Sequence, residues 1–412
     1  MRETIRPDGT PVTRPAGGTS RAVLSGVTAA LLATLVVPPA PAVAAPGCAG
    51  PRSQPAPTET PWALRRLDPT SAWRITRGEG ATVAVIDSGV SPAHPLLKGQ
   101  VREGRDYNGL PAARGQCDQA GHGTIVAGII AGREGTGAPY SGIAPAARIL
   151  PIRVLPDTRQ SSDTGLPVEI GQAIRWAVEQ DVQVINLSLA TFDRPELAAA
   201  VEYALSKNVV VVAAAGNRQE EQQDRPAYPA AYPGVIAVAG VDPQGGHVGS
   251  SVSGDYVDVA APGLDIIGPA PSGAGYLTEP QGGTSFAAAY VSGVAALLLS
   301  AEPDLTPEQV AHRITRTADN PPDGHNPEVG YGVVNPYRAL TSLLGTRSDP
   351  PAGALPPPAP TRDPLAGQRT VALWAAGVGA VVAGLLLAAR PILDRGRRRG
   401  WRPGRRTEPV DA

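Results

Sequence analysis

Three residues far apart in the chain, Asp87, His122 and Ser285, carry the side chains that nucleophilic catalysis by serine requires. A serine hydroxyl is a weak nucleophile at neutral pH unless a histidine accepts its proton and a carboxylate holds that histidine in the right tautomer. The order Asp, His, Ser is one of the chain orders known for this chemistry. Glycines close to all three leave room for a peptide backbone to approach. The pattern therefore predicts a serine protease.

Each of the three residues also has an ordinary structural explanation when it is taken alone. Asp87 suits the exit of a strand into a turn, His122 suits the start of a helix, and Thr284 or Ser285 suits a helix N-cap. The catalytic interpretation adds that ligand-binding groups gather at the carboxyl ends of parallel strands. It adds as well that a helix N-terminus stabilises negative charge. The presence of all three residues in this order, each with a glycine close by, favours catalysis.

Asn217 is a candidate donor to the oxyanion that forms during acyl transfer. It directly follows Gly216, at the end of an apolar run. A side-chain amide at the exit of a strand is well placed to donate a hydrogen bond to an oxyanion. An asparagine in a turn after glycine is the alternative explanation, and composition alone does not separate the two.

The other four histidines do not lie in a Gly-His-Gly-Thr sequence like that of His122. His94, in a proline-rich turn, is expected to make a structural hydrogen bond. The remaining three are expected in loops or at the surface: His247, His312 and His325. No acidic loop of the calcium-binding type stands out, so we expect neither a metal nor a cofactor.

The elements that must position these residues alternate strands with helices. Five segments rich in Val and Ile, without period-two alternation, are expected strands of a sheet covered on both faces. They are Thr82–Ile86, Arg148–Leu155, Val182–Leu189, Val209–Ala214 and Val235–Val241. Helices are expected at His122–Gly132, Val168–Gln180, Pro195–Lys207, Thr284–Ser300 and Pro307–Ala318, the last with Thr306 as N-cap. This alternation predicts an α/β, doubly wound domain with a mostly parallel sheet and helices on both faces.

The two ends of the chain resemble targeting segments. Residues 22–37 form an apolar run that arginines precede and small residues follow, which is typical of a cleaved secretory signal; an uncleaved anchor is the alternative. Residues 371–389 are uncharged, apolar and long enough to cross a bilayer. Eight arginines follow this stretch, which predicts a cytoplasmic C-terminus. A cell-wall sorting signal is disfavoured because no Leu-Pro-x-Thr-Gly motif is completed upstream.

Composition divides the chain into six expected parts. They are a signal peptide (1–44), an N-terminal extension (45–63), a peptidase domain (64–344), a proline-rich linker (345–370), a transmembrane helix (371–389) and a basic cytoplasmic tail (390–412). Although the net charge is −1, the part expected outside the membrane carries about −8. Nucleic acid is therefore not an expected partner.

Both cysteines, Cys48 and Cys117, lie in the part expected outside the membrane. An even number of cysteines in an oxidising compartment predicts a disulfide between them. A lipid-modified Cys48 is the weaker alternative, because the residues before it make a poor lipidation motif.

Over roughly residues 60–340 the chain resembles the subtilases, the subtilisin-like serine proteases of peptidase family S8. The resemblance rests on the frames Asp87-Ser88-Gly89, Gly121-His122-Gly123-Thr124 and Gly283-Thr284-Ser285. It implies a subtilisin-like fold, in which Asp87, His122 and Ser285 are the catalytic triad and Asn217 is the oxyanion donor. It also implies two substrate-binding segments: Ser188, Leu189 and Ala190 beside the substrate backbone, and Ala214, Ala215 and Gly216 along the P1 pocket.

The layout of the whole chain is similar to that of the mycosins, the membrane-anchored subtilases of actinobacterial type VII secretion systems. The resemblance implies a single-pass membrane protein whose protease domain lies outside the cytoplasm. It further implies protein or peptide substrates among exported proteins, and membrane components of the secretion system as partners. A mainly structural component of a secretion complex and a stand-alone membrane subtilase remain alternatives. An esterase is disfavoured, because its Gly-x-Ser-x-Gly elbow and its Ser, acid, His order are missing.

Overall fold

The computed structural model describes residues 48–135, 137–156, 165–218, 225–319, 324–342 and 366–401. The expected signal peptide (1–44), most of the expected linker (residues 345–365) and the last part of the expected basic tail (residues 402–412) lie outside the described residues. The chain divides into two compact units at Ser342, and each unit is described by itself.

A seven-stranded sheet in the order β2-β3-β1-β4-β5-β6-β7 forms the centre of the first unit. Every pairing in it is parallel. The strands are β1 (Thr82–Asp87), β2 (Arg105–Asp106), β3 (Arg148–Arg153), β4 (Val184–Leu187), β5 (Val210–Ala214), β6 (Ile236–Val241) and β7 (Val259–Pro262). The five expected strands are confirmed. Strand β2, which has only two residues, and β7, a short strand that ends in proline, were not predicted.

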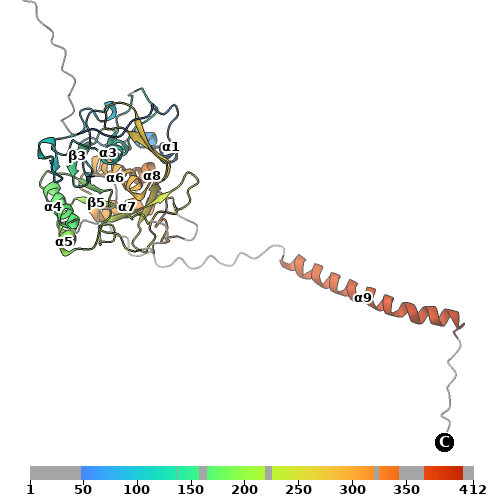
Figure 1. Ribbon diagram of the computed structural model, residues 1–412. Helices are drawn as coiled ribbons and strands as arrows, with labels where there is room; N and C mark the ends of the chain where they lie inside the picture. The colour runs from blue at the N-terminus through green and yellow to red at the C-terminus, as the bar shows by residue number, and fades with distance from the viewer. Residues whose placement is uncertain are drawn as a thin grey trace, which may run out of the picture. The chain divides into compact units, whose positions relative to one another are not determined.

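Helices cover both faces of this sheet (Figure 1). They are α1 (Trp62–Leu67), α2 (Pro69–Ala72), α3 (His122–Ala131), α4 (Leu166–Val178), α5 (Pro195–Ser206), α6 (Thr284–Ala301), α7 (Pro307–Thr317) and α8 (Pro336–Thr341). Alternate residues of β1 face opposite layers: Val83 and Val85 pack in one cluster with α3 and α6, and Ala84 and Ile86 in another with α4 and α5. The predicted doubly wound architecture is confirmed, and so is the Thr306 cap of α7.

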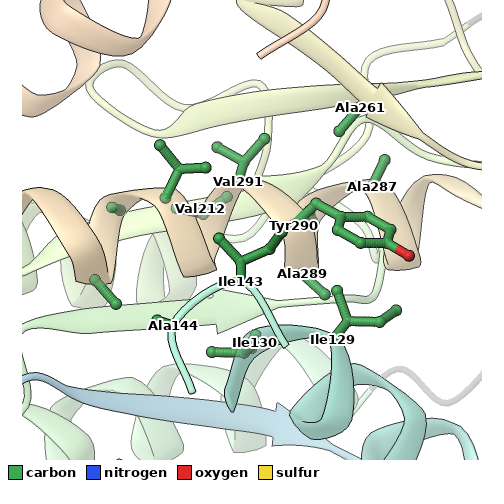
Figure 2. Close-up of a cluster of buried hydrophobic side chains, with 14 of the residues drawn as sticks. Ile129, Ile130, Ile143, Ala144, Val212, Ala261, Ala287, Ala289, Tyr290 and Val291 are labelled. Carbon is green, nitrogen blue, oxygen red and sulfur yellow. The ribbon is translucent and has the colours of Figure 1, made fainter. Parts of the chain in front are cut away.

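Helix α6 runs through the core as a helix that is apolar on every side. All residues from Thr284 to Leu299 are buried, as expected for a helix without a polar face. Figure 2 shows Tyr290 of α6 close to Ile129 of α3. Packing is tight further along, because a Cβ at Gly293 would lie 2.6 Å from Cβ of Ile143. The helix that carries Ser285 in its first turn is therefore closely packed on all sides.

A two-stranded antiparallel hairpin, β8 (Ile266–Pro269) and β9 (Tyr276–Glu279), stands apart from the main sheet. It packs against α3, where a Cβ at Gly268 would lie 2.7 Å from Cγ2 of Ile125. The N-terminal extension pairs with it: Gln54 and Tyr276 exchange backbone hydrogen bonds of 2.7 and 2.8 Å. This hairpin was not predicted, and residues 280–283 connect its second strand to α6, the helix that carries Ser285.

The second unit contains the long helix α9 (Ala366–Arg398). Its portion Val371–Arg398 contains an 18-residue window with a mean hydropathy of 2.3 and is long and apolar enough to cross a membrane. Helix α6, with 18 residues and a mean hydropathy of 1.6, is also long and apolar enough to cross a membrane, but it is largely buried in the first unit. The helix extends beyond the predicted span of residues 371–389 at both ends.

Candidate active site

Asp87 and His122 are joined by a short hydrogen bond at the carboxyl edge of the sheet. Asp87 is the last residue of β1, and His122 is the first residue of α3. Nδ1 of His122 lies 2.7 Å from Oδ1 of Asp87. Because a carboxylate only accepts hydrogen bonds, Nδ1 carries the proton and Nε2 is left as the acceptor. This is the tautomer that a general base requires.

The protonated form of His122 is favoured by its surroundings. Burial alone would lower the pKa of His122, but the charge and hydrogen bond of Asp87 oppose that effect. The carboxylates of Asp118 and Glu279 act in the same direction as Asp87. The pKa of His122 is therefore raised above its usual value of 6.5.

A second buried carboxylate, Asp118, fixes the N-terminus of α3. Its Oδ1 accepts hydrogen bonds from the amide of Gly121 at 2.7 Å and the hydroxyl of Ser88 at 2.9 Å. Its Oδ2 accepts from the amide and the hydroxyl of Thr124, at 2.8 and 2.6 Å. Asp118 thus replaces the capping side chain that Gly121 lacks, although burial raises the pKa of its carboxyl. This role of Asp118 was not predicted from the sequence.

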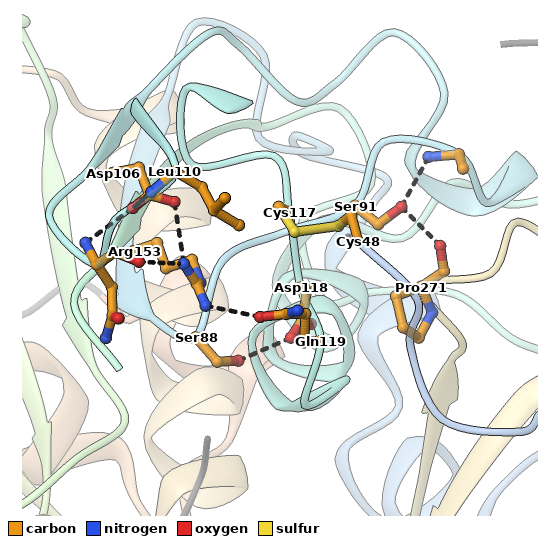
Figure 3. Close-up of a disulfide and its surroundings, with 12 residues drawn as sticks. Cys48, Ser88, Ser91, Asp106, Leu110, Cys117, Asp118, Gln119, Arg153 and Pro271 are labelled. Carbon is orange, nitrogen blue, oxygen red and sulfur yellow. Dashed lines mark hydrogen bonds and ion pairs between the residues drawn. A yellow bond between two sulfur atoms is a disulfide. The ribbon is translucent and has the colours of Figure 1, made fainter. Parts of the chain in front are cut away.

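The residues on either side of Asp118 are also anchored (Figure 3). Cys117 forms a disulfide with Cys48, with 5.6 Å between the Cα atoms. Gln119 accepts a 3.0 Å hydrogen bond from the buried Arg153. The predicted disulfide is therefore present, and it ties the N-terminal extension to the segment that leads into His122.

Ser285 lies in the first turn of α6, directly before Phe286, whose ring packs beside the His122 ring. The rings of His122 and Phe286 are 5.1 Å apart between centroids. The Ser285 hydroxyl donates to the carbonyl of Ser188 at 3.0 Å, and the Ser188 hydroxyl donates to the carbonyl of Ser285 at 2.7 Å. Hydrogen bonds between nucleophile and base often form only when substrate binds, and this arrangement fits a resting state.

Asn217 follows β5 and faces the N-terminus of α6. Its Oδ1 accepts hydrogen bonds from the amide and the hydroxyl of Thr284, at 3.0 and 3.1 Å. The amide nitrogen is thereby turned toward Gly283, where a Cβ would lie 3.1 Å from Nδ2. Gly283 has a φ of +151°, which favours glycine. Asn217 and the first-turn amides of α6 therefore meet beside Ser285.

The predicted substrate-binding residues flank Ser285 on two neighbouring strands. Ser188 and Leu189 are buried just after β4, and Ala190 is partly exposed. Ala214, Ala215 and Gly216 are buried at the end of β5. Their part in substrate binding stays a prediction.

Nδ1 of His94 accepts the amide of Leu96 at 3.2 Å, which confirms the expected structural hydrogen bond. Among the residues that the structure describes, no group of three or more His, Cys, Asp or Glu side chains is arranged to hold a metal ion.

Comparison with known proteins gives a consistent set of relatives. The family model for peptidase S8, the subtilase family, matches residues 78–332. Mycosin-1 of Mycobacterium tuberculosis (strain ATCC 25618 / H37Rv) is 35% identical over 407 residues, which cover 84% of this chain and 89% of that protein. The solved structure of the serine protease MycP1, an essential component of the type VII (ESX-1) secretion system, has a TM-score of 0.64 and 36% identity, covering 72% of this chain and 92% of that chain. A chain of an intact ESX-5 inner membrane complex has a TM-score of 0.62 and 30% identity, and the match covers 87% of this chain and 99% of that chain.

Proposed function

Because this chain belongs to the subtilase family of serine endopeptidases, we propose that Asp87, His122 and Ser285 are its catalytic triad. The 2.7 Å hydrogen bond from His122 to the buried Asp87 is the observation that carries the proposal. Ser285 supports it, because it lies at the N-terminus of the buried helix α6, directly before Phe286, whose ring packs beside the same imidazole.

In the proposed mechanism the Ser285 hydroxyl turns from the Ser188 carbonyl to Nε2 of His122 and attacks the carbonyl carbon of the scissile bond. His122 takes the hydroxyl proton, and Asp87 stabilises the imidazolium that results. Asn217 and the Ser285 amide donate to the oxyanion of the tetrahedral intermediate. His122 then protonates the leaving amine, and a water molecule hydrolyses the acyl-enzyme by the same route in reverse.

The acyl half of the substrate is proposed to lie between the two segments that flank Ser285. Its backbone would run along Ser188–Ala190, and its P1 side chain would enter the space beside Ala214–Gly216. The support is geometric: the Ser188 side chain and carbonyl contact Ser285 directly, and the amide of Gly216 donates to the hydroxyl of Thr284 at 3.2 Å.

We further propose a mycosin-like role at a membrane, with the peptidase domain outside the cytoplasm and type VII secretion components as partners. Helix α9 supports anchoring by one span. The similarity to Mycosin-1 over 84% of this chain, and to a chain of the ESX-5 inner membrane complex, supports the association with secretion. Exported proteins are then the proposed substrates.

The test of catalysis is Ser285→Ala in the full-length chain in detergent, with hydrolysis of a denatured protein substrate as the readout. We expect hydrolysis to be lost, whereas Ser206→Ala, at an exposed position of α5, should retain it. Continued hydrolysis by the Ser285 variant would show the proposal to be wrong.

The mainly structural role is a separate candidate, which the similarity to a chain of an assembled membrane complex favours. It is distinguished by complementing a deletion strain with Ser285→Ala and measuring secretion. Full rescue would show that catalysis is dispensable for export, and failed rescue at normal protein level would show that it is required.

A further inference from the structure

Glu279 is an exposed carboxylate at the end of β9 that the proposed triad does not use. Two residues earlier on the same strand, Leu277 is buried against the start of α3, since a Cβ at Gly121 would lie 2.5 Å from its Cδ1. Side chains two residues apart on a strand point to the same face. Glu279 therefore points to the face on which His122 follows Gly121.

The charge of Glu279 reaches the imidazole and is not neutralised locally. Glu279 is one of three carboxylates, with Asp87 of β1 and Asp118 before α3, that raise the pKa of His122. Within the part of the chain that the structure describes, the Glu279 carboxylate forms no ion pair and no side-chain hydrogen bond. A negative charge is thus presented to solvent beside His122.

The proposed mechanism puts the leaving half of a substrate on the same side of Ser285 as Glu279. The proposed acyl half lies against Ser188–Ala190, which contacts Ser285 from the β4 side. His122 delivers its proton to the amine of the other half. In the proposed mechanism the residues that follow the scissile bond therefore lie on the His122 side of Ser285, which is the side to which Glu279 points.

We propose that Glu279 makes this protease prefer substrates with lysine or arginine in the first two positions after the scissile bond. The inference rests on the proposed function and adds a substrate class to it. An exposed ion pair contributes little, so the expected preference in kcat/KM for a cationic over a neutral residue is about two- to fivefold. The preference should shrink as salt screens the pair.

The experiment uses the full-length chain in detergent and three internally quenched peptides that differ only in those two positions: Lys, Gln or Glu. Mass spectrometry fixes the cleavage position, and kcat/KM is measured at low and high salt. We expect the order Lys, Gln, Glu at low salt. Glu279→Gln should remove the difference between the Lys and Gln peptides and shift the acidic limb of kcat/KM to lower pH, and Glu279→Lys should reverse the order.

The matched control is Glu202→Lys, which makes the same change in net charge at an exposed position of α5, on the other face of the sheet. It should keep the wild-type order. Equal kcat/KM for the three wild-type peptides, or an unchanged order in Glu279→Lys, would overturn this inference alone. No Ser285-dependent cleavage of any peptide would overturn the proposed function and this inference with it.

Discussion

Asn217 uses its oxygen to hold Thr284, and this use orients its nitrogen. Because Oδ1 accepts two hydrogen bonds from Thr284, the amide nitrogen is turned to the side where the oxyanion is proposed to form. Such a preoriented donor stabilises charge that exists only in the transition state. Asn217 should therefore affect kcat and leave substrate binding nearly unchanged.

We expect Asn217→Ala to lower kcat by about 10²–10³-fold with little change in KM. Steady-state kinetics on one cleavable peptide measures both constants, and circular dichroism checks that the variant is folded. A rise in KM at unchanged kcat would instead assign Asn217 to ground-state binding.

The raised pKa of His122 gives a pH prediction whose sign is fixed. In the proposed mechanism His122 must be neutral to accept the Ser285 proton, so we expect activity to fall as pH drops through the pKa of His122. Because that pKa lies above 6.5, the acidic limb of kcat/KM should have its midpoint above pH 6.5. A pH profile between 5 and 9 on an uncharged peptide measures it. A midpoint below 6.5 would contradict the prediction.

At the scale of elements, the N-terminus of α3 depends on a carboxylate outside the helix. Helices usually take their N-cap from the residue at the cap position, but α3 begins after Gly121. Asp118 fills that role from three residues upstream and also binds Ser88, which follows Asp87. One carboxylate therefore ties the two elements that carry Asp87 and His122.

Asp118→Ala should lower the free energy of unfolding by about 1–3 kcal/mol, because buried donors lose their acceptor. Thermal unfolding of the full-length chain measures the loss, and Asp304→Ala, at an exposed position, should change little. An unchanged melting temperature for the Asp118 variant would show that water replaces the carboxylate.

At this scale, the sequence predicts those elements whose type can be recognised from residues that are neighbours in the chain. Strand β1 and helix α6 are long apolar segments, so their type and their polar end residues, Asp87 and Ser285, are readable from neighbours in the sequence. Asp118 stands three residues before Gly121, so its capping of α3 could have been predicted from the sequence. The effect of Glu279 on His122 could not have been predicted, because only the packing of β8 and β9 on α3 brings the strand of Glu279 to the start of α3.

At the scale of the whole molecule, burial distinguishes two apolar helices that hydropathy alone cannot distinguish. Helices α6 and α9 are both long and apolar enough to cross a membrane. Helix α6 is buried among the first unit's own elements, whereas α9 leaves large apolar side chains such as Leu385 and Leu387 more than 60% exposed within its unit. Exposed apolar area of that kind requires a partner or a bilayer, which agrees with the proposed anchor.

The disulfide acts on the first unit as a whole, because Cys48 and Cys117 are 69 residues apart and β1 lies between them. Closing a loop of that length restricts the unfolded chain, so its loss should cost about 4 kcal/mol, or roughly 10 °C in melting temperature for a domain of this size. We expect Cys48→Ala/Cys117→Ala in the full-length chain to show this drop by differential scanning calorimetry. The wild type in reductant should match the double variant, and reductant should leave the double variant unchanged. A double variant that melts with the oxidised wild type would mean that the hydrogen bonds between Gln54 and Tyr276 suffice to hold the extension in place.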